Sequence, residues 1–115
     1  MSSYNPGYNP VYNYPQVNYP QANLVKYVRV GEIYMRGVAK LYLYSMGQVS
    51  VLSAQIDSTP YVSQALSSYY LMKGYNEITV YFSGILNSLK VGERRTVLLT
   101  TGDKDVVGIP AVVVG

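Results

Sequence analysis

Apolar and polar residues alternate with a period of two along much of the chain after residue 24. The clearest case is EITVYFSG at positions 77–84, where Ile, Val and Phe occupy every second position. Such alternation is typical of a strand with one buried face. Related patterns predict strands at 24–30, 37–44, 49–56, 95–101 and 106–114. The last contains Pro110 and is therefore expected at a sheet edge, where its exposed backbone would offer a seam for binding other copies.

The predicted strands follow one another at intervals of about ten residues, with turn-forming residues between them. One turn is expected at 45–48, between two apolar strands. The chain has 115 residues and a mass of 12.8 kDa, which is enough for one hydrophobic core. We therefore predict a mainly β domain at 24–115, built as an antiparallel β-sandwich or barrel.

One segment does not follow the two-residue period. Apolar residues there recur at helical spacing, and Pro60 and Gly74 suit the first turn and the end of a helix. The pattern predicts one short helix near 60–73, and the alternative is a pair of strands that turn at Ser67 and Ser68. The residues at helical spacing are Val62, Ala65, Leu66, Tyr69 and Tyr70.

The first 23 residues differ in composition from the rest of the chain. They contain no charged residue, four of the six prolines and five of the 14 tyrosines, and Tyr-Asn-Pro occurs at 4–6 and again at 8–10. Each proline lacks an amide donor and pushes the residue before it away from helical backbone angles. The sequence therefore predicts that residues 1–23, called the leader below, form an extended, polyproline-like arm.

Composition narrows the functional classes. The chain has no Cys, His or Trp, and only 13% of its residues are charged. Thiol nucleophiles, histidine acid–base catalysis and Cys/His metal sites are excluded. The acidic pair in Asp103-Lys104-Asp105 is more typical of a solvated turn than of a cation site. We predict no enzyme activity, no catalytic residues, no metal and no cofactor.

Charge and hydropathy bear on partners and location. The net charge of +3 comes from scattered basic residues, with Arg94-Arg95 as the longest run, so no specific nucleic-acid binding is expected. Glu93-Arg94-Arg95 is interpreted as local charge pairing that protects a strand edge. The N-terminal residues do not resemble an export signal, and the apolar runs are far shorter than the roughly 18 residues of a membrane span.

Two segments resemble parts of immunoglobulin-like domains. LYLYSMGQVSVLSAQI at 41–56 resembles their strand, glycine turn and strand, and LKVGERRTVLLTTG at 89–102 resembles a Gly-Glu turn followed by a Thr/Val/Leu strand. The resemblance implies an immunoglobulin-like β-sandwich of the kind found in archaeal virion or surface-appendage proteins. Surface members usually carry an apolar export or anchoring helix before the sandwich. The leader stands in that place here, which favours a virion component.

The leader supports a hypothesis about assembly. Tyrosines along a stiff, extended backbone offer large contact areas at low entropic cost. The free energy gained by burying these tyrosines is about equal to the entropic cost of ordering the arm. The arm is therefore expected to become ordered only where contacts with neighbouring subunits add further stabilisation. The predicted assembly contacts are Tyr4, Tyr8, Tyr12, Tyr14, Tyr19, Pro6, Pro10, Pro15 and Pro20.

The sequence thus predicts a structural subunit, most simply a capsid, turret or filament protein of an archaeal virus. Its partners would be further copies of itself, other structural proteins of the same particle, or both. The predicted location is the virion, with the cell surface or an extracellular appendage as the alternative. A second hypothesis is a carbohydrate- or receptor-binding module with a flexible tail. In it, Tyr69, Tyr70, Tyr75 and Tyr81 would stack on the sugar rings of a host glycan.

Overall fold

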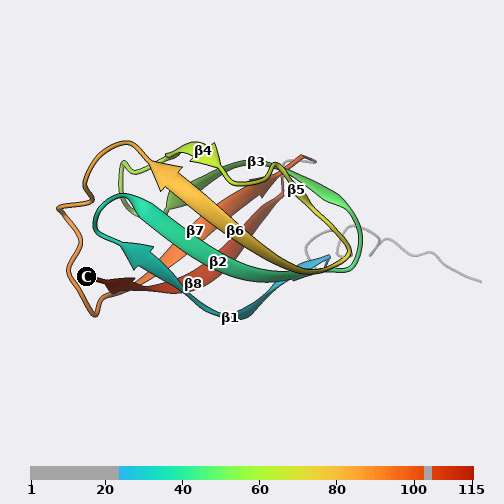
Figure 1. Cartoon of the computed structure of the whole chain (residues 1–115), viewed down its shortest axis with the longest axis horizontal. Coiled ribbons are helices and arrows are strands. Elements are labelled where there is room, and N and C mark those ends of the chain that lie inside the picture. The colour runs from blue at the N-terminus through green and yellow to red at the C-terminus, as the bar shows by residue number, and fades with distance from the viewer. Residues whose placement is uncertain (1–23, 103–104) are drawn as a thin grey trace, which may run out of the picture.

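The computed structural model describes residues 24–102 and 105–115, and the predicted leader contacts lie outside these residues. The described residues form eight strands and no helix (Figure 1). The strands are β1 (Val25–Tyr34), β2 (Val38–Ser45), β3 (Val49–Ile56), β4 (Ser63–Leu66), β5 (Tyr70–Leu71), β6 (Gly74–Phe82), β7 (Arg94–Thr101) and β8 (Val106–Val114). The six strands predicted from alternation are all present, with ends displaced by four residues at most.

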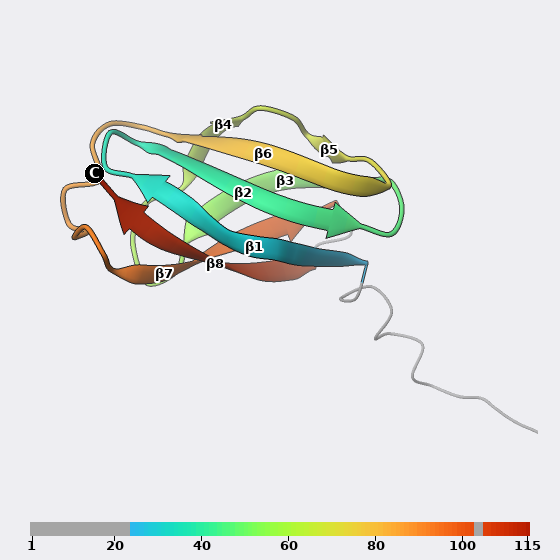
Figure 2. The ribbon, with the colours of Figure 1, turned by 60° about the horizontal axis from the view of Figure 1, so that its bottom comes forward.

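The strands form one curled sheet in the order β4-β6-β2-β1-β8-β7-β3-β5. β6, β2 and β1 lie side by side in one wall, and β3 and β7 lie in the wall behind it (Figures 1 and 2). Neighbouring strands are antiparallel except β1 and β8, which are parallel. The mainly β prediction is confirmed. The sheet is mixed and curls into a half-barrel, so a wholly antiparallel sandwich was too narrow a prediction.

The two walls are joined through only part of β1 and β8. Their ladder pairs Gly31 with Ala111 and ends with Tyr34 opposite Val114. The ladder does not include residues 25–30 of β1 or residues 106–110 of β8. The ladder that joins the two walls is therefore confined to the end of the molecule where β1 and β8 finish.

The prediction that β8 is an edge strand was wrong, because β8 lies between β1 and β7. Pro110 is tolerated there for a local reason. Val113 directs its N–H and its C=O toward the segment before β7, where Glu93 accepts at 2.8 Å and Gly92 donates at 2.7 Å. Because these directions alternate along a strand, Pro110 directs its nitrogen away from β7. The proline therefore removes no β7 hydrogen bond, and the β1 ladder begins only at the next residue.

The core is the interior of the curled sheet, and it consists of one face of each long strand. In β2 the inward residues Ala39, Leu41 and Leu43 are fully buried, whereas their neighbours remain partly exposed. Two leucines from the connection between β6 and β7, Leu86 and Leu89, are also buried. The alternation in the sequence therefore corresponds to side chains that point alternately into the core and toward the solvent.

The predicted helix near 60–73 is absent, and β4 and β5 occupy that segment. The alternative of two strands that turn at Ser67 and Ser68 is right about the strands but wrong about their pairing. β4 pairs with β6, and β5 pairs with β3, so the segment crosses from one wall to the other. The ladders and backbone bonds offered by β3 and β6 outweigh the weak local preference for a helix.

The turn at 45–48 is confirmed by the break between β2 and β3. It does not form a hairpin, because β2 pairs with β1 and β6 whereas β3 pairs with β7 and β5. Met46 within the turn donates its amide hydrogen to the carbonyl of Leu24 at 2.8 Å. The start of β1 is therefore attached to the end of β2.

Candidate interaction surface

The outer side of β1, β2 and β6 carries a group of aromatic and charged side chains. This group is called the tyrosine face below and consists of Arg29, Glu32, Tyr42, Tyr44, Tyr75 and Glu77. β2 directs Tyr42 and Tyr44 outward because its alternate residues fill the core. The strand register places Tyr42 opposite both Arg29 of β1 and Glu77 of β6. Three segments far apart in the sequence therefore contribute side chains to one patch.

Arg29, Glu32 and Tyr42 form a connected group on this face. The Arg29 guanidinium carbon lies 3.9 Å from the centre of the Tyr42 ring, a cation–π contact. The Tyr42 hydroxyl donates to Oε1 of Glu32 at 2.6 Å, and Nη1 of Arg29 lies 3.9 Å from Oε2 of the same carboxylate. The hydrogen bond to Glu32, with burial as a smaller cause, raises the pKa of Tyr42 to about 12. The positive and the negative charge both have partners within the group.

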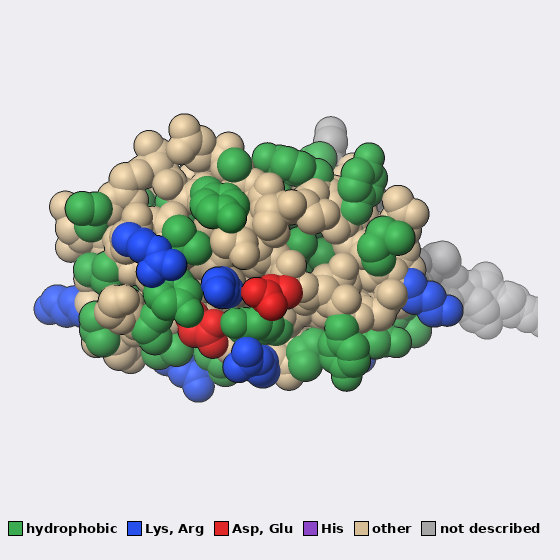
Figure 3. All heavy atoms as spheres, in the orientation of Figure 1, with side chains coloured by type: hydrophobic (Ala, Val, Ile, Leu, Met, Phe, Trp, Pro, Cys, Tyr) green, Lys and Arg blue, Asp and Glu red, His purple; other side chains and the backbone are tan. Residues whose placement is uncertain are grey.

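The neighbouring pair Tyr44 and Tyr75 extends the tyrosine face. Their ring centres are 5.4 Å apart with an interplanar angle of 79°, an edge-to-face arrangement. Tyr75 is 77% exposed, an unusually open position for a large aromatic ring. Figure 3 shows acidic and basic side chains near the middle of this side of the molecule, with hydrophobic side chains around them.

A shallow groove of about 260 Å³ lies in the tyrosine face and is called the tyrosine groove below. Its lining combines two aromatic rings, one aliphatic side chain, one amide and two charged side chains, and ligand sites in proteins commonly combine aromatic surface with a few polar groups in this way. The lining residues are Val28, Arg29, Tyr42, Tyr75, Asn76 and Glu77.

Asn76 fixes the β5–β6 end of the groove. Its Oδ1 accepts from the Met72 amide at 2.9 Å, and its Nδ2 donates to the carbonyls of Met72 and Gly74, each at 2.9 Å. These three bonds close the turn that leads from β5 into β6. This arrangement holds Tyr75 next to a rigid turn, so the groove wall is preorganised.

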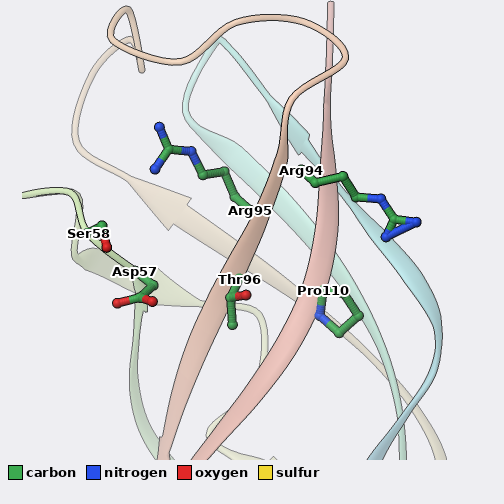
Figure 4. A pocket seen from close by; sticks show the side chains of 6 residues that line it. All are labelled: Asp57, Ser58, Arg94, Arg95, Thr96 and Pro110. Carbon is green, nitrogen blue, oxygen red and sulfur yellow. The ribbon is translucent and has the colours of Figure 1, made fainter.

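A second pocket of about 360 Å³ lies at the start of β7. Its lining residues are Asp57, Ser58, Arg94, Arg95, Thr96 and Pro110. Its arginines suggest an anion site, but they extend to opposite sides of β7 (Figure 4). Arg95 also pairs with Glu93, with 3.0 Å between Nη2 and Oε2. The Asp57 carboxylate would also repel an anion. The tyrosine groove is therefore the stronger candidate for a binding site.

The pairing of Arg95 with Glu93 confirms the local charge pairing expected of Glu93-Arg94-Arg95. Glu93 also accepts from the Lys90 amide at 3.0 Å, and this bond is the main cause that lowers the pKa of its carboxyl. The expected edge protection was wrong, because β7 lies between β8 and β3.

The four tyrosines proposed for sugar stacking do not share one platform. Tyr75 and Tyr81 lie near opposite ends of β6, about 20 Å apart at strand spacing. Tyr70 belongs to β5 beside β3, and the Tyr69 hydroxyl accepts from the Leu66 amide at 3.3 Å. Each of the four is exposed, but only Tyr75 lines the tyrosine groove.

Sequence reasoning did not single out Arg29, Glu32 or Tyr42. Their grouping depends on cross-strand register and on the irregular pairing of β1 around Arg29. The only sequence signal was the placement of Tyr42 and Tyr44 on the polar face of an alternating strand. No single strand contains the pattern of the whole site.

Two further features bear on function. Residues 103 and 104 of the acidic turn lie outside the described residues, and the Asp105 carbonyl accepts from the Thr101 amide at 2.9 Å. Among the described residues, no three acidic side chains cluster in a way that would hold a metal ion. The same part of the chain contains no helix long and apolar enough to cross a bilayer.

Comparisons with known proteins identify a protein of similar fold and a protein family. In structure the chain is similar to the archaellum periplasmic stator protein FlaG from Sulfolobus acidocaldarius, with a TM-score of 0.50 and 15% identity. That match covers 75% of this chain and 96% of FlaG, and it shows a likeness of fold. None of the curated proteins compared matches the chain. A family model described as "protein of unknown function (DUF973)" matches residues 3–113, through the leader and the strands, so the chain belongs to the DUF973 family.

Proposed function

We propose that this protein is a structural subunit of an archaeal cell-surface appendage, fastened to neighbouring subunits by its leader. The role is mechanical, with no catalytic step. The observation that carries the proposal is the tyrosine face, which exposes aromatic rings while its central Arg29 and Glu32 are already paired. A surface with satisfied charges and open aromatic rings is suited to being covered by protein.

Two further observations support this function. The family model begins at residue 3, so it includes the uncharged, tyrosine-rich leader together with the β domain. Exposed aromatic residues are also found away from the groove, at Tyr27 and Tyr81. Several contact surfaces on one small domain are what a subunit with more than one neighbour requires.

The choice of a surface appendage follows from the fold comparison. FlaG, a periplasmic stator protein of the archaellum, has the same general fold over most of its own length. The narrower expectation of a virion subunit gains no support from the FlaG match. We therefore place the protein at the cell surface, with copies of itself or other structural proteins of the same appendage as partners. We also propose that the domain is related in fold to the immunoglobulin-like domains that its sequence resembles.

Sedimentation velocity over a wide range of protein concentration tests the proposal. The full-length chain is expected to form species larger than a monomer, and their share is expected to rise with concentration. A chain that lacks residues 1–22 is expected to remain monomeric, because the leader contacts are gone. Far-UV circular dichroism of both proteins verifies that the β domain is folded.

A full-length chain that stays monomeric at every concentration, with its leader rapidly cleaved by protease, would contradict the proposal. A truncated chain that assembles as well as the full-length chain would show that the strands, and not the leader, hold the subunits together. A matched control is the full-length chain with Leu52→Ser. Leu52 lies on β3, is 52% exposed and does not line the groove, so its loss should leave assembly unchanged.

A further inference from the structure

We propose that the tyrosine groove is the receptor for the leader of a neighbouring copy of this chain. The inference rests on the proposed function and names the surface through which assembly occurs. It follows from three observations: the aromatic lining of the groove, the composition of residues 1–23, and the place where the leader joins the domain.

The lining of the groove matches the chemistry of the leader. Grooves walled by aromatic side chains bind polyproline-like segments, because proline rings pack flat on aromatic rings and the stiff segment loses little entropy. Tyr42 and Tyr75 supply such rings, and Val28 adds an aliphatic surface. The sequence predicts a polyproline-like conformation for residues 1–23, which contain four prolines.

The charges of the groove favour the same occupant. Arg29 is stacked on Tyr42 and lies 3.9 Å from Glu32, so the groove does not hold a free cation that would call for an acidic ligand. The leader contains no charged residue. Binding it would therefore add no charge to the interface, and its asparagine and tyrosine side chains can donate hydrogen bonds to the Glu77 carboxylate that lines the groove.

The point where the leader joins the domain favours a neighbouring copy over the same chain. Val25 lies opposite Ser45, and Ser45 lies opposite Gly74, so β1 begins at the end of the molecule where β6 also begins. The groove residue Val28 is only four residues from Leu24. For the Tyr-Asn-Pro repeat at 4–10 to bind within the same chain, the stiff leader would have to double back on itself. An extended leader of 23 residues reaches about 70 Å, which suits the groove of another subunit.

Disulfide trapping between two variants tests this directly, because the chain has no native cysteine. One full-length variant carries Val11→Cys in the leader and the other carries Val28→Cys in the groove. Under mild oxidation the mixed proteins are expected to form a cross-linked heterodimer about tenfold faster than a control mixture, because binding raises the local thiol concentration. In the control, Leu52→Cys on β3 replaces Val28→Cys.

Each outcome bears on the proposal. A heterodimer that forms no faster than the control overturns the groove as the receptor, and sedimentation of the same proteins shows whether assembly itself persists. A single chain carrying both cysteines that closes only an internal disulfide also overturns it, because the leader then binds its own groove. If sedimentation detects only monomers and no cross-link forms, the groove and the proposed function both fail.

A substitution without cysteines gives a second measurement. Tyr75→Ser in the full-length chain is expected to weaken assembly about tenfold in dissociation constant, because an exposed aromatic anchor is lost. Tyr75 is exposed, so the domain should still fold, which circular dichroism verifies. The matched control is Tyr70→Ser on β5, which removes a 55% exposed tyrosine outside the groove. Equal assembly of the two variants would contradict the proposal.

Discussion

The hydroxyl of Tyr42 on β2 donates a hydrogen bond of 2.6 Å to the carboxylate of Glu32 on the neighbouring β1. This bond joins two strands on the outer face of the sheet and fixes the ring on which Arg29 is stacked. It also holds one wall of the tyrosine groove in place. The position of the Tyr42 ring therefore depends on this cross-strand contact.

Glu32→Gln is expected to bring the pKa of Tyr42 down from about 12 toward its ordinary value near 10. Since the folded-state pKa is raised, the bond stabilises the fold below pH 10, and this contribution is lost as pH rises from 10 through 12. Gln keeps an oxygen that accepts from the Tyr42 hydroxyl but loses the charge, so the variant should be less stable by up to about 1 kcal/mol at pH 8, and the difference from the wild type should shrink above pH 11.

Tyrosine-selective ¹³C NMR titration measures the pKa, and urea unfolding at several pH values measures the stability. Glu77→Gln is the matched control, because it removes the same charge from the tyrosine face while Tyr42 keeps its hydrogen bond. Glu77 is the smallest of the causes acting on Tyr42, so the control should shift the pKa much less. A pKa of Tyr42 that is unchanged in Glu32→Gln would refute the assignment.

Gly31→Ala is expected to destabilise the fold by about 1–3 kcal/mol, since added bulk in a close-packed site forces the backbone to move. A Cβ at this position would lie 2.5 Å from the carbonyl oxygen of Lys40. Gly31 is also where the ladder between β1 and β8 begins. Gly47→Ala is the control, because a Cβ there meets nothing within 4 Å. Chemical denaturation of both variants makes the comparison, and similar losses in the two would be inconsistent with the close approach.

Asn76→Ala is expected to cost about 1–2 kcal/mol, because the Met72 amide loses its acceptor and two carbonyls lose a donor. Hydrogen exchange of the Met72 amide should accelerate in the variant, while amides in the centre of β2 remain protected. Asn76→Asp separates the two roles, because it keeps the acceptor and removes the donor. Unchanged exchange at Met72 in Asn76→Ala would show that the side chain does not hold this turn.

Leu86→Ala is expected to destabilise the fold by about 2–5 kcal/mol, the range for a buried leucine that leaves a cavity. Leu86 lies in the connection between β6 and β7, is fully buried, and donates its amide hydrogen to the Met35 carbonyl at 2.8 Å. Ile85→Ala is the control, since Ile85 is 66% exposed. Thermal unfolding distinguishes the two, and an equally small loss for both would mean that this connection is not part of the core.

The helix predicted near 60–73 shows where local patterns mislead. Leu66 and Tyr70 lie four residues apart, but Leu66 is buried and Tyr70 is exposed, and they belong to strands in two different walls. Their spacing looks helical only because the chain crosses between the walls. The Ser67 amide donates to the Thr79 carbonyl at 2.8 Å, and the Val51 amide donates to the Tyr69 carbonyl at 2.9 Å. These bonds come from residues distant in sequence, which a local pattern does not contain.

The sequence by itself determined the six long strands, because alternation is a property of each strand's own residues. A strand that alternates in this way buries all its apolar side chains on one face of the sheet. The sequence also distinguished the uncharged leader from the β domain, because amino-acid composition does not depend on the fold. The tertiary structure decided the strand order, the parallel pairing of β1 with β8, and the tyrosine groove. The groove joins Arg29, Tyr42 and Glu77 across three strands, and a register of hydrogen bonds between strands exists only once the sheet has formed.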